Sequence, residues 1–204
     1  MKHLRRISLS FLRSSIIFFF SAVLFSGCIE SGISDTIVIK SSTSQEEIFK
    51  FPADDAVSFR EKGMGQDVNL TQAKIYSQND ARKKLFDKIG KNIEVKINAV
   101  YNEFSSDEEK DLFSFTFDLK NFVFGMIEEK VVYEDNDYYQ QVKIIYKDGT
   151  ESTVNRYYIF AVVEKEYVSM AFKNGVDYYF WKYFKNTEKN KEFFNQLKMI
   201  NLNY

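Results

Sequence analysis

The chain has 204 residues, with 28 Lys and Arg against 29 Asp and Glu, one Cys and one His. This balance leaves no basic footprint for DNA or RNA, so nucleic acid is not an expected partner. Because the one histidine is His3, the chain beyond it has no imidazole for acid–base work or for metal ligation. Ser-His and Cys-His hydrolases are thereby excluded. Carboxylates or lysines could still do chemistry, but none stands out, and we expect no enzyme, no cofactor and no metal site.

Residues 1–27 have the three parts of a secretory signal. Basic residues come first, an apolar run follows from Ile16 to Phe25, and the small residues Ser26 and Gly27 end it. This run is too short to cross a bilayer as a stable helix, which needs about 20 apolar residues. We therefore expect a cleaved signal peptide.

Leu24-Phe25-Ser26-Gly27-Cys28 resembles the lipobox of bacterial lipoproteins, although Phe25 stands where a smaller aliphatic residue is usual. The resemblance implies a diacylglycerol thioether on Cys28, cleavage before it, and a further acyl chain such as palmitate on the new N-terminus. Two or more chains anchor a protein stably in a bilayer, whereas one holds it only marginally. The alternative is an ordinary buried cysteine in an uncleaved anchor. Since Ile29 is not the aspartate that retains many lipoproteins at the inner membrane, the outer membrane is the expected location.

Removing residues 1–27 from the 204 leaves 177 residues, enough for one domain and hardly enough for two. The signal takes four basic residues with it, so 24 basic residues remain against 29 acidic ones, a formal charge of −5. We divide this part into a lipidated N-terminus and flexible tether, 28–50, and a single α+β domain, 51–204. Residues 37–39 of the tether are apolar and alternatively form an edge strand.

The domain begins with a short strand-like stretch at residues 56–59, followed by Gly63-Met64-Gly65. Two glycines around one residue indicate a tight turn or a close backbone approach. Asn69 with Gln72 then forms a weak capping box for a long helix. Apolar or small residues step along one face of this helix at intervals of three or four: Leu70, Ala73, Ser77, Ala81, Leu85, Ile89, Ile93 and Ile97. Beyond Gly90 an alternating strand pattern fits equally well.

The middle of the chain is harder to interpret. Residues 106–122 suit a helix or a strand, and the capping box of Ser106 with Glu109 favours the helix. Residues 126–133 and 138–147 read as an antiparallel hairpin joined by an acidic loop, 134–137. That loop lacks the pattern of an EF-hand, so a solvated turn is favoured over a calcium site.

A second turn is expected at residues 147–150, followed by a strand at 156–163. After Val163 the period becomes helical, which predicts one helix over 164–184 and a last helix over 187–200. Phe180, Trp181 and Phe184 lie off the apolar stripe of the first of these helices. We take these three residues as a candidate interaction surface. Burial of these side chains within the domain by the last helix is the preferred interpretation, and burial by another subunit is the alternative.

In the order of three sequence segments, the chain resembles the Lpp-twenty-like family of small bacterial outer-membrane lipoproteins, some of which are flagellum-associated. The matching pieces are the glycine turn at 63–65, the helix with Ala73, Ala81 and Leu85, and the run 161–165 before a helix. The resemblance implies an α+β fold, with a long helix on a curved antiparallel sheet of three to four strands and C-terminal helices. The family has no established enzymatic activity, so the resemblance implies no catalytic residues.

Two functions follow from these expectations. The first is an envelope lipoprotein acting as a structural or interaction module, self-assembling or part of a motility-associated complex, with the bilayer as a partner through Cys28. The second is a periplasmic carrier that holds an apolar ligand between the long helix and the sheet. The carrier needs a dry cavity there.

Overall fold

The computed structural model describes residues 33–42, 54–104, 109–200 and 202, and it has the predicted α+β fold. The elements in chain order are β1 (Ile33–Ser41), β2 (Ser58–Asp67), α3 (Leu70–Phe104), α4 (Glu109–Ile127), the 3-10 turn η2 (Glu128–Lys130), β3 (Val132–Tyr146), β4 (Glu151–Glu164), α5 (Lys165–Tyr183) and α6 (Glu188–Met199). The four strands form one open antiparallel sheet in the order β1-β3-β4-β2.

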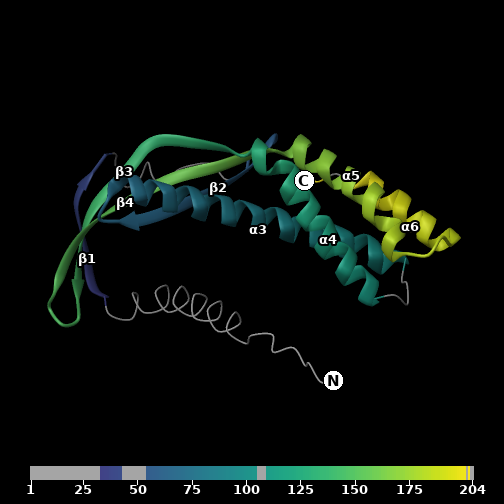
Figure 1. The fold of residues 1–204 in the computed structure, drawn as a ribbon, viewed down its shortest axis with the longest axis horizontal. Helices are drawn as coiled ribbons and strands as arrows, with labels where there is room; N and C mark the ends of the chain where they lie inside the picture. The colour runs from purple at the N-terminus through teal and green to yellow at the C-terminus, as the bar shows by residue number, and fades with distance from the viewer. Residues whose placement is uncertain (1–32, 43–53, 105–108, 201, 203–204) are drawn as a thin grey trace, which may run out of the picture.

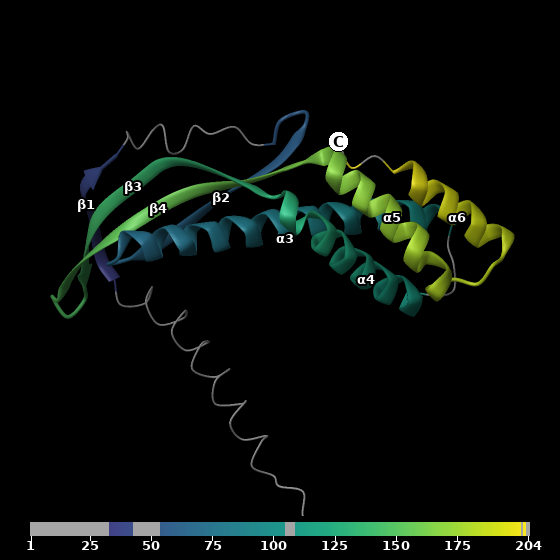
Figure 2. The same cartoon turned by 45° about the horizontal axis from the view of Figure 1, so that its top comes forward.

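The molecule is elongated along α3 (Figure 1). The curved sheet lies along the first half of this helix, and α4, α5 and α6 gather around its second half (Figures 1 and 2). With 35 residues, α3 is about 52 Å long at 1.5 Å per residue. One helix therefore joins a sheet end of the molecule to a helical end.

The apolar face predicted for the long helix is confirmed. Every residue of that stripe from Ala73 to Ile97 is fully buried, whereas Leu70 remains 39% exposed. The burial of Ile93 and Ile97 also resolves the ambiguity beyond Gly90, because the helix continues in phase to Phe104.

The predicted N-cap of this helix is confirmed as well. The Asn69 side-chain oxygen accepts hydrogen bonds from the backbone N–H groups of Thr71 (2.9 Å) and Gln72 (3.3 Å). The N–H group of Asn69 itself donates to Asp67, at 2.8 Å. The reciprocal half of the capping box therefore uses an aspartate before the helix.

The two glycines of the 63–65 stretch do not form a turn. Strand β2 runs straight through them, and the alternative of a close backbone approach is correct. A Cβ atom on Gly63 would lie 2.1 Å from the Ser77 carbonyl oxygen, and one on Gly65 would lie 1.9 Å from that of Ala73. The Ser77 hydroxyl donates to the Gly63 carbonyl at 3.0 Å. Helix and strand therefore touch backbone to backbone.

The predicted hairpin between residues 126–133 and 138–147 is wrong. Met126 and Ile127 end α4, and Glu128–Lys130 form η2. Residues 132–146 form the single long strand β3, which has a register irregularity between Glu134 and Tyr138. The true hairpin joins β3 to β4 at residues 147–150, the second predicted turn, where Gly149 has φ of 81°. A left-handed residue fits glycine because it lacks a Cβ.

The tether prediction is wrong for residues 33–41. They form the edge strand β1, the alternative raised by residues 37–39, and pair antiparallel with β3 from Ile33 opposite Tyr146 to Ser41 opposite Gln140. The sheet therefore begins only five residues after Cys28. Cys28 itself, the signal segment and the capping residue Ser106 lie outside the described residues.

The helical interpretation of the middle segment is correct. Helix α4 turns Leu112, Phe115, Leu119 and Val123 inward, each at most 8% exposed. Hydrophobic spacing of three and four, rather than alternation, therefore governs this part of the chain.

We expect Gly63→Ala to lower the free energy of unfolding by about 3 kcal/mol or more, the upper range for overpacked cores. The added methyl group would collide with the backbone of α3, which has no rotamer by which to yield. Urea denaturation of the whole chain measures the change. Gly125→Ala is the control: nothing lies within 4 Å of the position that its methyl group would take, so this helical substitution should stabilise by about 0.5–1 kcal/mol. Equal midpoints for Gly63→Ala and the wild type would contradict the contact.

Candidate interaction groove

The structure does not support the predicted interaction surface of Phe180, Trp181 and Phe184 as a unit. Phe180 is fully buried and Phe184 is 3% exposed, so neither lies on a surface, and only Trp181 is partly open, at 43%. The preferred interpretation, burial within the domain, is correct for the two phenylalanines. The ring of Phe180 stacks on Phe184 at 4.7 Å and meets Phe193 of α6 edge-on at 5.4 Å.

Helix α5 is aromatic on two sides because it lies between α4 and α6. On the α4 side, the Phe115 ring contacts Phe180 at 5.8 Å and Phe184 at 5.5 Å. Gly175 lets the two helices approach, since a Cβ atom there would lie 2.4 Å from Leu119. On the α6 side, the ring of Trp181 lies 5.3 Å from that of Phe194.

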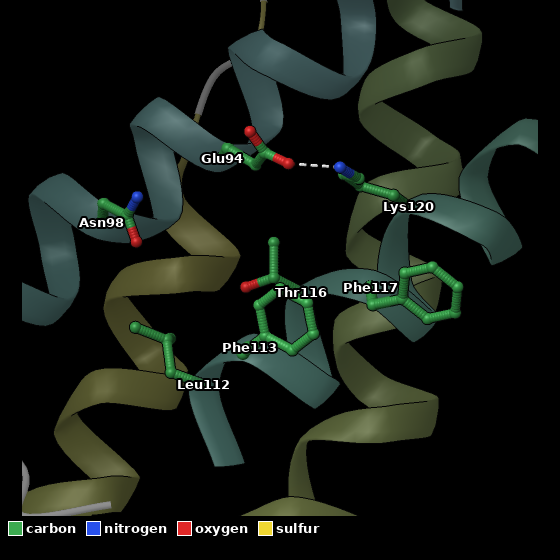
Figure 3. A pocket seen from close by; sticks show the side chains of 7 residues that line it. All are labelled: Glu94, Asn98, Leu112, Phe113, Thr116, Phe117 and Lys120. Atoms are coloured by element: carbon green, nitrogen blue, oxygen red, sulfur yellow. Dashed lines mark hydrogen bonds and ion pairs between the residues drawn. The ribbon is translucent and has the colours of Figure 1, made fainter. Parts of the chain in front are cut away.

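A groove lies instead between α3 and α4, next to the buried stripe of α4 (Figure 3). We call it the α3–α4 groove. It has a volume of about 460 Å³ and is lined by Glu94 and Asn98 of α3 and by Leu112, Phe113, Thr116, Phe117 and Lys120 of α4. Phe113 is 76% exposed and Phe117 is 55% exposed. Two large aromatic side chains one helical turn apart therefore stand open to solvent beside a hollow.

The packing of the two helices explains where this groove lies. The rings of Phe86 on α3 and Phe124 on α4 stack at 5.0 Å and close the space at that level. One turn of α4 back, Lys120 forms an ion pair with Glu94 across the two helices (Figure 3). One turn further back, at Thr116, the groove separates the two helices.

The lining has the composition of a binding site. Leu112, Phe113 and Phe117 offer apolar surface, and the rim carries an amide, a hydroxyl and an ion pair, which is a common composition for ligand and partner sites. Sequence reasoning missed this site. The available signal was the i, i+4 pair Phe113 and Phe117 on the helical face opposite Phe115 and Leu119.

The acidic stretch 134–137, predicted as a solvated turn, lies instead within β3 at the register irregularity. Asp137 has φ of 55°, and the Tyr157 hydroxyl donates to Asp135 at 2.7 Å and to Asp137 at 2.8 Å. Lys74 of α3 pairs with Asp135. Among the described residues, no group of three or more His, Cys, Asp or Glu side chains could hold a metal ion.

The contacts within this cluster lower the pKa of Asp135 and raise the pKa of Tyr157. Burial alone would raise the pKa of Asp135, but the bonds from Lys74, Tyr157 and the Asp137 N–H outweigh it and lower that pKa. Burial and the two carboxylates raise the pKa of Tyr157 far above its usual range, so its hydroxyl stays protonated. The cluster therefore ties the irregular part of β3 to β4 and to α3.

We expect Tyr157→Phe to lower the free energy of unfolding by about 1–3 kcal/mol near neutral pH, because a shared donor to two carboxylates is lost. A lowered carboxyl pKa contributes stability above the unfolded value near 3.9, and that stability is lost as pH falls through the folded pKa. The variant should therefore lose less stability than the wild type between about pH 5 and pH 3. Tyr158→Phe, whose hydroxyl bonds the neutral Gln140, is the control and should keep the wild-type acid dependence. Parallel acid profiles for all three proteins would contradict this assignment.

In the part of the chain that the structure describes, no helix is long and apolar enough to cross a membrane. No protein-family model matches the chain, and no curated protein or solved structure matches it.

Proposed function

We propose that this protein is a bacterial envelope lipoprotein, anchored by acylated Cys28 in the outer membrane, whose domain is a self-assembling interaction module. The proposal of self-assembly rests on two exposed aromatic side chains, Phe113 and Phe117, beside the α3–α4 groove. The anchoring part is supported by Leu24 to Cys28 and by the resemblance to small outer-membrane lipoproteins. A place in a motility complex rests on that resemblance alone.

A second copy of the chain is the proposed partner because one surface carries both a projecting side chain, Phe113, and a hollow, the α3–α4 groove. A two-fold interface uses the same patch on both molecules, so that patch must be complementary to itself. In such a dimer, Phe113 of each copy fills the groove of the other. The ion pair of Glu94 with Lys120 stands at the rim, where polar groups are usual in interfaces.

The anchor is tested by the intact mass of the protein purified from membranes of the cell that makes it. We expect the mass of a chain cut before Cys28 and carrying acyl chains. Cys28→Ala should lose both the cleavage and the lipid, since the thioether needs the thiol. An unmodified, full-length wild-type chain would contradict the lipoprotein assignment.

Self-assembly is tested by sedimentation equilibrium of the chain from residue 28 onward with Cys28→Ser, which keeps strand β1. We expect a dimer that Phe113→Ala weakens about a hundred-fold or more, because two phenylalanine side chains lose burial worth about 1.5–3 kcal/mol each.

The matched control for this variant is Tyr178→Ala, an aromatic of similar exposure (73%) on α5, away from the groove. It should leave the dimer unchanged. A wild-type monomer at micromolar concentration, or equal weakening by both variants, would contradict assembly through the groove.

The second candidate is a carrier of an apolar ligand, and the observation that favours it is the volume of the same groove, which falls in the range of ligand sites. The position expected from the sequence, between the long helix and the sheet, is occupied at Gly63 and Gly65 by backbone contacts. Native mass spectrometry of the purified protein separates the two functions: a co-purified small molecule lost in Phe113→Ala supports the carrier, and a twofold mass supports assembly.

A further inference from the structure

We infer that the β3–β4 turn at the sheet end of the domain faces the phospholipid headgroups, while the α3–α4 groove is held away from the bilayer. The inference rests on the proposed acylation of Cys28 and adds to it the surface that contacts the membrane. It follows from the length of chain between the anchor and the sheet, and from where the sheet begins.

The chain allows little distance between the lipid and β1. Ile33, the first residue of β1, is five residues after Cys28, and five residues span at most about 18 Å when fully extended. Ile33 lies opposite Tyr146, the last residue of β3, and the turn follows directly at Lys147. The turn is therefore held within this short reach of the membrane surface.

The groove lies near the other end of the molecule. The Asn155 side chain bonds the carbonyl of Val68, which places the start of α3 beside β4 only a few residues beyond the turn. Glu94 and Asn98 come 24 and 28 residues after Leu70, so they lie about 36–42 Å further along the axis of α3. Figures 1 and 2 show the turn and the helices α4 to α6 at opposite ends of the long axis.

The turn has the chemistry of a surface that meets headgroups without entering the hydrocarbon. Lys147, Asp148, Thr150 and Glu151 are all exposed and carry charges of both signs or a hydroxyl. Charged side chains are costly in the bilayer centre but are well solvated at its surface. The acyl chains therefore supply the anchoring, and the turn fixes the orientation.

This orientation favours assembly. Copies anchored in one leaflet would present their grooves at one height, and confinement to a surface raises the effective concentration of each groove for its neighbour.

The test uses the full-length acylated protein with one added thiol, since Cys28 is then blocked by its lipid. Asp148→Cys places a bimane label in the turn, and Glu188→Cys places it at the start of α6, at the far end. The proteins are reconstituted in phosphatidylcholine–phosphatidylglycerol vesicles with nitroxide-headgroup lipid. We expect the label at position 148 to lose most of its fluorescence and the label at position 188 to keep it.

A matched control inserts 20 Gly and Ser residues between Ser31 and Gly32, which adds a span of about 25 Å on average. Quenching at position 148 should then fall, although acylation is unchanged. Quenching at position 188 alone, at both positions equally, or at neither, in protein whose mass proves acylation, would overturn the orientation and leave the anchor standing. An unacylated Cys28 would overturn the proposed function and the orientation together.

Discussion

The backbone contact between α3 and β2 is the constraint on which the rest of this structure depends. Gly63 and Gly65 face α3 beside the small buried residues Ala73, Ser77 and Ala81, and a Cβ atom on either glycine would collide with the backbone of the helix. This contact holds the first half of α3 on the sheet. The second half of the helix then projects beyond the sheet (Figure 1), where Ile93 and Ile97 are buried in the core that the remaining helices share. A molecule with two distinct ends follows from one helix that is longer than its sheet.

The two edge strands of the sheet, β2 and β1, differ in how side chains cover them. At β2, the N–H group of Met64 donates to Asp80 at 2.9 Å, that of Arg60 donates to Asp54 at 2.8 Å, and the Lys88 ammonium donates to the Arg60 carbonyl at 3.3 Å. Charged side chains that occupy an edge in this way prevent further strands from adding to it. β1 forms the other edge, and there residues 37–39 are 44–54% exposed. Its first residue, Ile33, lies opposite Tyr146 beside the β3–β4 turn, and Cys28, the proposed anchor, comes five residues before it.

Much of this fold could be predicted from the sequence, because burial repeats with the period of each element. The stripe from Ala73 to Ile97, the cap at Asn69 and the turn at Gly149 are local features, and the sequence predicts each of them correctly.

The errors share a physical cause. The segment 134–137 has the composition of a turn, but tertiary bonds from Tyr157 and Lys74 hold it within a strand. Strand β1 contains the polar run Ser34 to Thr36 and ends in Lys40 and Ser41, and it is a strand because β3 pairs with it. Phe180 and Phe184 are buried, as the preferred interpretation has it, and do not form the candidate surface, because α4 and α6 together cover them.

In the proposed assembly, exposure at the α3–α4 groove, and not aromatic content in general, determines what the domain binds. The most direct measurement is photocrosslinking in cells that make the protein, with benzoylphenylalanine in place of Phe113 and, in a parallel strain, of Tyr178. We predict a crosslinked product of twice the chain mass at position 113 and none at position 178. Crosslinks at position 178 alone, or none at position 113 to a second copy, would contradict assembly through the groove.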